Sequence, residues 1–266
     1  MSLVLKKSIY LFIFCLLFLP SCHSDSSDKI RIATAANMQF AMQALTQAFT
    51  DKNHIECEVI LSSSGKLNAQ IKNGAPFDIF VSADLKYPTD LYEHGFALNA
   101  PKVYAQGRLI LWSTLENFTP SLNWLTQKTF QHLALANPKT APYGVAALEV
   151  LDKLNLYEQV KEKLVFGENI AQTNQFVTTQ AAQVGFTSKS VIYAPHLKTK
   201  GNWQEISSEY YSPIQQGVIL LKNNRNKQEQ AQAFFDFLFS KEAKKILESF
   251  GYGVSFDEES LRPLPK

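Results

Sequence analysis

The chain has 266 residues, of which 45% are hydrophobic, 12% aromatic and 19% charged, with a formal net charge of +2. This composition excludes a disordered chain, which would be poor in aromatic residues and strongly charged. It lacks the basic excess of a nucleic-acid-binding protein, and its three cysteines are too few for a disulfide scaffold. The length suits one large domain or two modest ones.

The N-terminal segment is typical of an export signal. Lys6 and Lys7 precede an apolar run over residues 9–19, which is shorter than the ~20 residues that a membrane-spanning helix needs. We therefore predict a signal peptide over residues 1–21. Ser21 before Cys22 is similar to a bacterial lipobox, so Cys22 is a candidate for lipidation, although Pro20 is atypical there. Simple secretion and a buried N-terminal helix are the alternatives.

Cleavage before Cys22 changes the charge balance. It removes Lys6 and Lys7 and no acidic residue, which lowers Lys+Arg from 26 to 24 against 24 Asp+Glu. The mature chain is then formally neutral and keeps two cysteines, Cys22 and Cys57. If Cys22 is acylated, Cys57 has no partner and is expected to be a buried strand residue.

Strand and helix patterns alternate from residue 29 onward. Strands are predicted over residues 29–34, 57–61 and 78–83, with helices over residues 38–49 and through Leu67 and Ile71 between them. This order is typical of a parallel sheet with crossover helices.

A second unit repeats the theme. Its predicted strands cover residues 109–112, 133–136 and 164–166, its helices residues 145–154 and 169–180, and a last strand over residues 217–221 precedes two amphipathic helices within residues 228–250. Because no long linker separates the halves, we expect strands to cross between them, at residues 107–113 and 213–221.

The usual catalytic and metal-binding motifs are missing from the sequence. There is no HExxH, CxxC, GxGxxG or GxSxG, and the five histidines are scattered without ligand spacing. Residues 62–66 are not a phosphate loop, because Ile60 and Leu67 stand where that loop needs glycine and a hydroxyl residue.

Four junctions between strands and helices consist of small, neutral, hydrogen-bonding residues. They cover residues 35–38, 62–65, 137–144 and 167–170. Such junctions lie at the carboxyl ends of strands, where ligands bind, and helix N-termini expose N–H groups that attract anions. Four of them around one cleft would bind a compact oxyanion without a cation. Each residue also has a plain structural alternative: Asn37 and Ser64 as helix caps, Tyr143 as a packing residue.

These same segments resemble one family over residues 29–253. They read Ala-Ala-Asn-Met at 35–38, Ser-Ser-Gly-Lys at 63–66, Gly-Ala-Pro-Phe-Asp-Ile-Phe-Val-Ser-Ala-Asp at 74–84, Asn-Pro-Lys-Thr-Ala-Pro-Tyr-Gly at 137–144, Gly-Glu-Asn-Ile at 167–170 and Tyr-Ser-Pro-Ile at 211–214. The chain resembles the periplasmic molybdate-binding proteins of ABC transporters, the ModA family.

The resemblance implies an α/β, two-lobed periplasmic binding protein fold of type II, with mixed sheets flanked by helices and the ligand cleft between the lobes. Lobe 1 would comprise residues 29–107 plus 218–266, and lobe 2 residues 108–217. The implied protein is a non-enzymatic, periplasmic monomer without a cofactor. It would capture molybdate or tungstate and deliver it to a membrane permease, and lipidated Cys22 would anchor it.

The resemblance also implies the ligand-binding residues. Lobe 1 would contribute Asn37, where many relatives have serine, and Ser64; the N–H of Ala36 is a weaker candidate. Lobe 2 would contribute Tyr143 and Ile170, each at least through its backbone N–H.

One position departs from the family pattern. Many relatives have a tyrosine that donates to the oxyanion where this chain has Ser188. The phenol of Tyr143 is a candidate replacement for that donor.

Three rival functions remain at this point. A binding protein for sulfate or another oxyanion would use the same chemistry. A ferric-ion binder is suggested by adjacent Tyr210 and Tyr211, although no carboxylate or histidine cluster accompanies them. An exported hydrolase or lyase would need a nucleophile or an acid–base pair that the sequence does not show.

Overall fold

The computed structural model describes residues 29–127, 130–195, 197, 201–223 and 225–255. The expected signal peptide, residues 1–21, and Cys22 lie outside the described residues. Within the described ranges, no helix combines the length and apolar character needed to cross a membrane.

The first sheet has the strand order β2-β1-β3-β10-β4. Its strands are β1 (Ile30–Ala35), β2 (Cys57–Ser62), β3 (Ile79–Val81), β4 (Lys102–Gly107) and β10 (Ile214–Leu220). Strand β1 runs parallel to β2 and β3, whereas β10 is antiparallel to β3 and β4. The helical elements around it are η1 (Ala36–Met38), α2 (Gln39–Asn53), α3 (Ser64–Lys72), α4 (Lys86–Glu93), α8 (Gln228–Phe237) and α9 (Lys241–Ser249). We call this sheet and its helices lobe 1.

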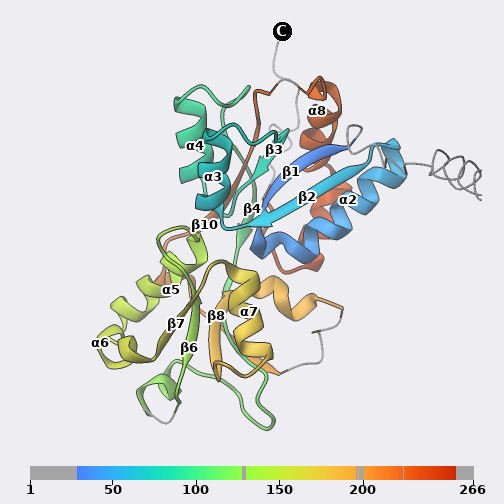
Figure 1. Ribbon diagram of the computed structural model, residues 1–266. Coiled ribbons are helices and arrows are strands. Elements are labelled where there is room, and N and C mark those ends of the chain that lie inside the picture. The colour runs from blue at the N-terminus through green and yellow to red at the C-terminus, as the bar shows by residue number, and fades with distance from the viewer. Residues whose placement is uncertain (1–28, 128–129, 196, 198–200, 224, 256–266) are drawn as a thin grey trace, which may run out of the picture.

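The second sheet has the order β7-β6-β8-β5-β9 and is also mixed. Its strands are β5 (Leu109–Ser113), β6 (Leu133–Ala136), β7 (Leu164–Gly167), β8 (Val184–Ser188) and β9 (Asn202–Glu205). It carries α5 (Pro142–Lys153), α6 (Tyr157–Val160), α7 (Ile170–Thr178) and the short helices η2 (Asn123–Gln127), η3 (Lys161–Lys163), η4 (Lys189–Tyr193) and η5 (Ser208–Tyr210). We call this lobe 2; it lies below lobe 1 in Figure 1. The predicted fold class, mixed sheets flanked by helices, is confirmed.

Alternate strand residues point to opposite faces of a sheet, and each sheet packs against helices on both faces. In β1, Ile30 and Ile32 pack with α2, α8 and α9, whereas Ala33 packs with α3 and α4. In β5, Leu109 and Leu111 pack against α5, whereas Trp112 packs against α7 on the other face. Each lobe therefore has its own core on both sides of its sheet.

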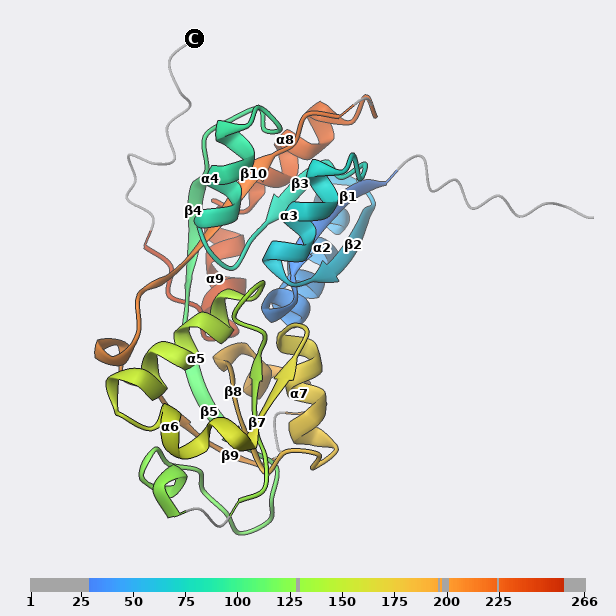
Figure 2. The ribbon, with the colours of Figure 1, turned by 60° about the vertical axis from the view of Figure 1, so that its left-hand side comes forward.

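The chain crosses between the lobes at two places. It leaves lobe 1 where β4 ends at Gly107 and enters lobe 2 where β5 begins at Leu109, a passage visible in Figure 2. It returns between η5 and β10, and the boundary expected at 217/218 falls inside β10, whose residues from Ile214 onward pair with β4.

Cys57 lies in a strand as predicted, but it is less buried than predicted. Cys57 is the first residue of β2, an edge strand of its sheet, and is only half-buried. Burial nevertheless raises the pKa of its thiol to about 12. The thiol therefore stays protonated and unreactive at neutral pH.

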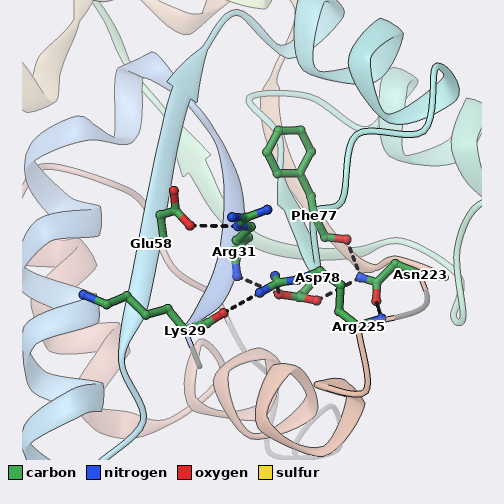
Figure 3. A network of polar contacts seen from close by, with 7 residues as sticks. All are labelled: Lys29, Arg31, Glu58, Phe77, Asp78, Asn223 and Arg225. Atoms are coloured by element: carbon green, nitrogen blue, oxygen red, sulfur yellow. Dashed lines mark hydrogen bonds and ion pairs between the residues drawn. The ribbon is translucent and has the colours of Figure 1, made fainter. Parts of the chain in front are cut away.

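Asp78, within the segment 74–84 that carries the family resemblance, has a structural role (Figure 3). Its carboxylate is 2% exposed, accepts a hydrogen bond from Arg31 N (2.7 Å) and from Asn223 Nδ2 (2.9 Å), and pairs with Arg225. Arg225 also donates to Lys29 O at 2.9 Å. A buried charge must be paired and hydrogen-bonded. These contacts satisfy the Asp78 carboxylate, and they join β1, the start of β3 and the segment after β10.

Candidate functional site

A small pocket lies between the lobes. It is lined by Ala35, Ala36, Asn37, Ser63, Ser64 and Ala83 from lobe 1, and by Ala141, Pro142, Tyr143, Asn169 and Ile170 from lobe 2. The four residues predicted from the sequence, Asn37, Ser64, Tyr143 and Ile170, are therefore brought together, with Ala36 beside them. The pocket lining contains no charged residue.

Four helical N-termini meet at this pocket, namely those of η1, α3, α5 and α7. The residues that precede the first three, Ala35, Ser63 and Ala141, make no side-chain capping bond. The first N–H groups of a helix have no partner within the helix. The pocket thus gathers uncapped N–H donors and the positive ends of helix dipoles, which together attract an anion.

The fourth N-terminus is held by a capping residue. Asn169 Oδ1 accepts from Gln172 N at 3.1 Å, and Gln172 Oε1 in turn accepts from Glu168 N at 2.6 Å. The cap leaves the N–H of Ile170, the first residue of α7, at the pocket.

Two serine hydroxyls of lobe 1 line the pocket. Ser64 Oγ is buried and accepts from Ala83 N at 3.0 Å, so its own hydrogen can still be donated. Ser63 Oγ is buried without a hydrogen-bond partner. Ser63 was missed by the sequence analysis; its place directly before α3 was the signal that could have found it.

Asn37 is 3% exposed and is bonded on several sides. Its Nδ2 donates to Gln216 Oε1 (3.0 Å) and to Tyr252 Oη (3.3 Å). Its backbone carbonyl oxygen accepts from Tyr252 Oη and from Ser190 Oγ, both at 2.8 Å. Since Ser190 belongs to lobe 2, this residue also joins the lobes.

Tyr143 is buried, and its phenol has no hydrogen-bond partner. Burial raises the pKa of this phenol well above its usual range, so the group is a neutral donor at physiological pH. The phenol lies against Gly107: a Cβ at that glycine would stand 2.2 Å from Tyr143 Oη. Only glycine at position 107 leaves room for it.

Ser188, the residue at the position of the family's tyrosine donor, is not among the residues lining the pocket. Its Oγ lies 2.9 Å from Ser190 Oγ, which donates to the carbonyl of Asn37. Ser188 therefore reaches the site through Ser190 and Asn37, and its side chain also lies beside the phenols of Tyr143 and Tyr252.

Three contacts close the pocket from outside. Gly65 N donates to Thr140 O at 2.9 Å, and Tyr87 Oη donates to Lys139 O at 3.3 Å. Lys66 Nζ and Glu168 Oε1 form an ion pair at 2.6 Å, with both side chains about half exposed. All three contacts join lobe 1 to lobe 2, so the structure is that of a closed cleft.

The tyrosine pair that suggested iron, Tyr210 and Tyr211, is not among the residues lining the pocket. Tyr211 Oη accepts from Leu109 N at 3.2 Å, and both Tyr210 and Tyr211 pack against the core beside α5. Among the residues that the structure describes, no group of three or more His, Cys, Asp or Glu side chains could hold a metal ion.

Comparisons with known proteins agree with this architecture. Residues 30–253 match the family model of the bacterial extracellular solute-binding proteins. The molybdate-binding protein ModA of Azotobacter vinelandii is 35% identical over 238 residues, which cover 89% of this chain and 94% of that protein. ModA of Rhodobacter capsulatus is 35% identical over 85% of this chain and 89% of its own length. The solved structure of the Azotobacter vinelandii periplasmic molybdate-binding protein superposes with a TM-score of 0.82 at 30% identity, covering 86% of this chain and all of that one. The chain therefore belongs to the bacterial extracellular solute-binding proteins, in the ModA family.

Proposed function

We propose that this protein captures molybdate, with tungstate as a second transported ligand, in the pocket between its lobes and delivers it to the membrane permease of an ABC transporter. The observation that carries the proposal is the meeting of four helical N-termini at one pocket without a charged lining residue. The relatives named as molybdate-binding proteins support the choice of ligand.

Neutral donors suit a dianion that must be held and then released. Hydrogen bonds to an ionised acceptor are about twice as strong as bonds between neutral groups. We assign donation to the Ser64 hydroxyl, to Asn37 and to the backbone N–H groups of Tyr143 and Ile170, with the Ala36 N–H and the Ser63 hydroxyl as further donors. A fixed salt bridge, which would accept any anion and slow its release, is avoided.

Selectivity follows from the same donor set. The backbone N–H groups in this set cannot accept a hydrogen bond from the O–H of protonated phosphate, which disfavours that ion. Sulfate carries no such hydrogen, so we assign discrimination against sulfate to the size of the pocket.

Lobe closure would present the loaded protein to the permease. The two interlobe connections, from β4 to β5 and from η5 to β10, form the hinge about which the lobes would open and close. We further propose that the protein acts as a monomer in the periplasm, tethered through lipidated Cys22.

Thermal unfolding with molybdate, tungstate, sulfate or phosphate tests the proposal. A ligand that binds only the native state stabilises it by RT ln(1 + [L]/Kd), about 4 kcal/mol at a thousandfold excess over Kd. We expect a large rise in Tm with molybdate and tungstate and little change with phosphate. An equal rise with sulfate would make the protein a general oxyanion binder, and a rise only with ferric ion would overturn the proposal.

A further inference from the structure

One short helix of lobe 2, η4, lies against the segment of lobe 1 that brings the first helical N-terminus to the pocket. Ser190 of η4 is 3% exposed, and its Oγ donates to the backbone carbonyl of Asn37 at 2.8 Å. Three residues after Asn37, Phe40 packs against the apolar cluster of lobe 2 on the α7 side of its sheet. Lobe 2 therefore contacts residues 37–40 through both a polar and an apolar group.

The hydrogen bonds around Ser190 have a fixed direction. The Asn37 carbonyl can only accept, so the single hydrogen of the Ser190 hydroxyl is committed to it. Ser188 Oγ lies 2.9 Å from Ser190 Oγ, and the Ser188 hydroxyl must then be the donor of that bond. Ser188 Oγ in turn accepts from Ser190 N at 3.3 Å, as the N-cap of η4. We call this chain of two hydroxyl groups, from Ser188 through Ser190 to the Asn37 carbonyl, the serine relay.

The Asn37 carbonyl accepts one hydrogen bond from each lobe. Tyr252 Oη, which belongs to lobe 1, donates to it at 2.8 Å. That bond lies within one lobe and can persist when the lobes part. The bond from Ser190 crosses between the lobes, and a hydrogen bond is lost once its two heavy atoms are more than about 3.5 Å apart. A small rotation of lobe 2 about the hinge would therefore break it.

The serine relay favours the closed state over an open one. In an open cleft, the Ser190 hydroxyl and the Asn37 carbonyl could each bond to water. In the closed cleft both residues are buried and depend on each other, and a buried polar group left without its partner is costly. The relay also fixes the Asn37 peptide group within η1, whose N-terminus lies at the pocket.

We propose that Ser190 is a positioning residue of the anion site: its hydroxyl, directed by Ser188, joins lobe 2 to the Asn37 carbonyl on closure and holds η1 in the geometry that binds the oxyanion. The inference rests on the proposed function. It gives position 188, where many relatives have a tyrosine that donates to the oxyanion, a different role in this chain: Ser188 supports closure through Ser190.

Ser190→Ala tests the inference through molybdate binding. The variant loses the bond only in the closed state, so we expect the Kd to rise about tenfold, the effect of one buried hydrogen bond. The change should appear as faster dissociation in stopped-flow measurements, with the association rate little altered, because the bond forms after the ligand has entered. High salt should preserve the difference, since salt screens charges and the relay is neutral. An unchanged Kd for Ser190→Ala would overturn the inference.

Ser113→Ala is the matched control. Ser113 is also buried, and its Oγ donates to a backbone carbonyl, that of Gln183, at 2.6 Å, but both residues belong to lobe 2. We expect this variant to have a lower free energy of unfolding and the wild-type Kd. An equal rise in Kd for Ser113→Ala and Ser190→Ala would attribute the effect to a less stable lobe 2 and would overturn the inference.

Two larger substitutions at the same position separate the hydroxyl from packing. Threonine and valine have nearly the same shape, but only threonine carries a hydroxyl group. Ser190→Thr should therefore bind molybdate about tenfold more tightly than Ser190→Val, whatever the cost of the added methyl group. Equal affinities of these two variants would contradict a role for the hydroxyl.

A double variant tests the order of the relay. Because Ser188 acts through Ser190, Ser188→Ala combined with Ser190→Ala should bind no more weakly than Ser190→Ala alone. Losses that multiply would assign Ser188 an effect of its own and overturn the relay. A wild-type protein that binds no molybdate would refute the proposed function and this inference together, whereas wild-type binding with an unchanged Kd for Ser190→Ala would leave the proposed function intact.

Discussion

Ser64 combines two roles in one hydroxyl group. Its oxygen accepts from Ala83 N, which fixes the side chain, and its hydrogen is left for the ligand. Removing it with Ser64→Ala deletes a bond to a charged acceptor, worth about 1.5–3 kcal/mol. We expect molybdate affinity, measured by calorimetry, to fall by about ten- to a hundredfold.

The neighbouring Ser62 provides the control. Ser62 ends β2 and is half-buried, but it does not line the pocket. Ser62→Ala should therefore keep the wild-type affinity. If Ser64→Ala also binds molybdate as wild type does, the hydroxyl of Ser64 is not a ligand donor.

Three buried tyrosines around the site set the response to alkaline pH. Burial raises the pKa of Tyr104, Tyr143 and Tyr252 above the usual value of about 10. The unfolded chain therefore loses these protons first, so the free energy of unfolding should be unaffected by them at neutral pH and fall above pH ~10, by about 1.4 kcal/mol per pH unit and tyrosine.

Denaturant unfolding across this pH range, with tyrosinate absorbance followed in parallel, measures the effect. Tyr143→Phe should make the fall of the free energy of unfolding with pH shallower by the contribution of one tyrosine, about 1.4 kcal/mol per pH unit. Ionisation of all tyrosines near pH ~10 in the still folded protein would contradict the expectation.

At the scale of elements, the N-terminus of α7 delivers a donor to the pocket, and Asn169 holds it there. Replacing a capping asparagine by alanine costs about 0.5–2 kcal/mol. Asn169→Ala should therefore lower the free energy of unfolding by this amount and weaken molybdate binding, because the Ile170 N–H is no longer fixed. Gln175→Ala, on the exposed side of the same helix, should change neither; an unchanged affinity in Asn169→Ala would show that the cap is needed for stability alone.

Local patterns were sufficient for most elements but not for all. Strands β1 and β2 show clear apolar patterns, and both were predicted. Strand β8 was not predicted, because its sequence over residues 184–188, Val-Gly-Phe-Thr-Ser, resembles a turn locally. Its Gly185 is needed for packing instead: a Cβ there would meet Val177 Cγ2 at 2.7 Å.

Local patterns likewise revealed only part of the candidate site. The four helix N-termini were found because each is a local junction of small residues at a strand end. Gln216 was missed because its partner Asn37 lies 179 residues away in the sequence, and nothing around a glutamine within a strand reveals that contact.

At the scale of the whole molecule, formal neutrality and anion binding are compatible. The expected mature chain has 24 basic and 24 acidic residues, and the pocket lining has none of either kind. In the proposed function, attraction for the dianion comes from the helix dipoles and N–H groups of both lobes. Because the lobes would share the ligand, contacts across the cleft should control its release.

The Lys66–Glu168 ion pair is the contact across the cleft that can be tested most cleanly. Exposed pairs contribute about 0.2–1 kcal/mol, so Lys66→Gln should speed molybdate dissociation by up to about fivefold at low salt. High salt should remove the difference, since exposed charges are screened. Lys52→Gln, which breaks the Lys52–Glu242 pair within lobe 1, is the control and should leave the dissociation rate unchanged.

Glu168→Gln separates two explanations for such a result. If the pair holds the lobes closed, loss of either partner speeds dissociation, and the double variant is no faster than the single ones. If Lys66 merely attracts the anion through its charge, Glu168→Gln should slow dissociation, because a negative charge near the pocket has been removed. Stopped-flow measurement of molybdate release from the three variants decides between them, and slower release from Glu168→Gln would refute the role of this pair in closure.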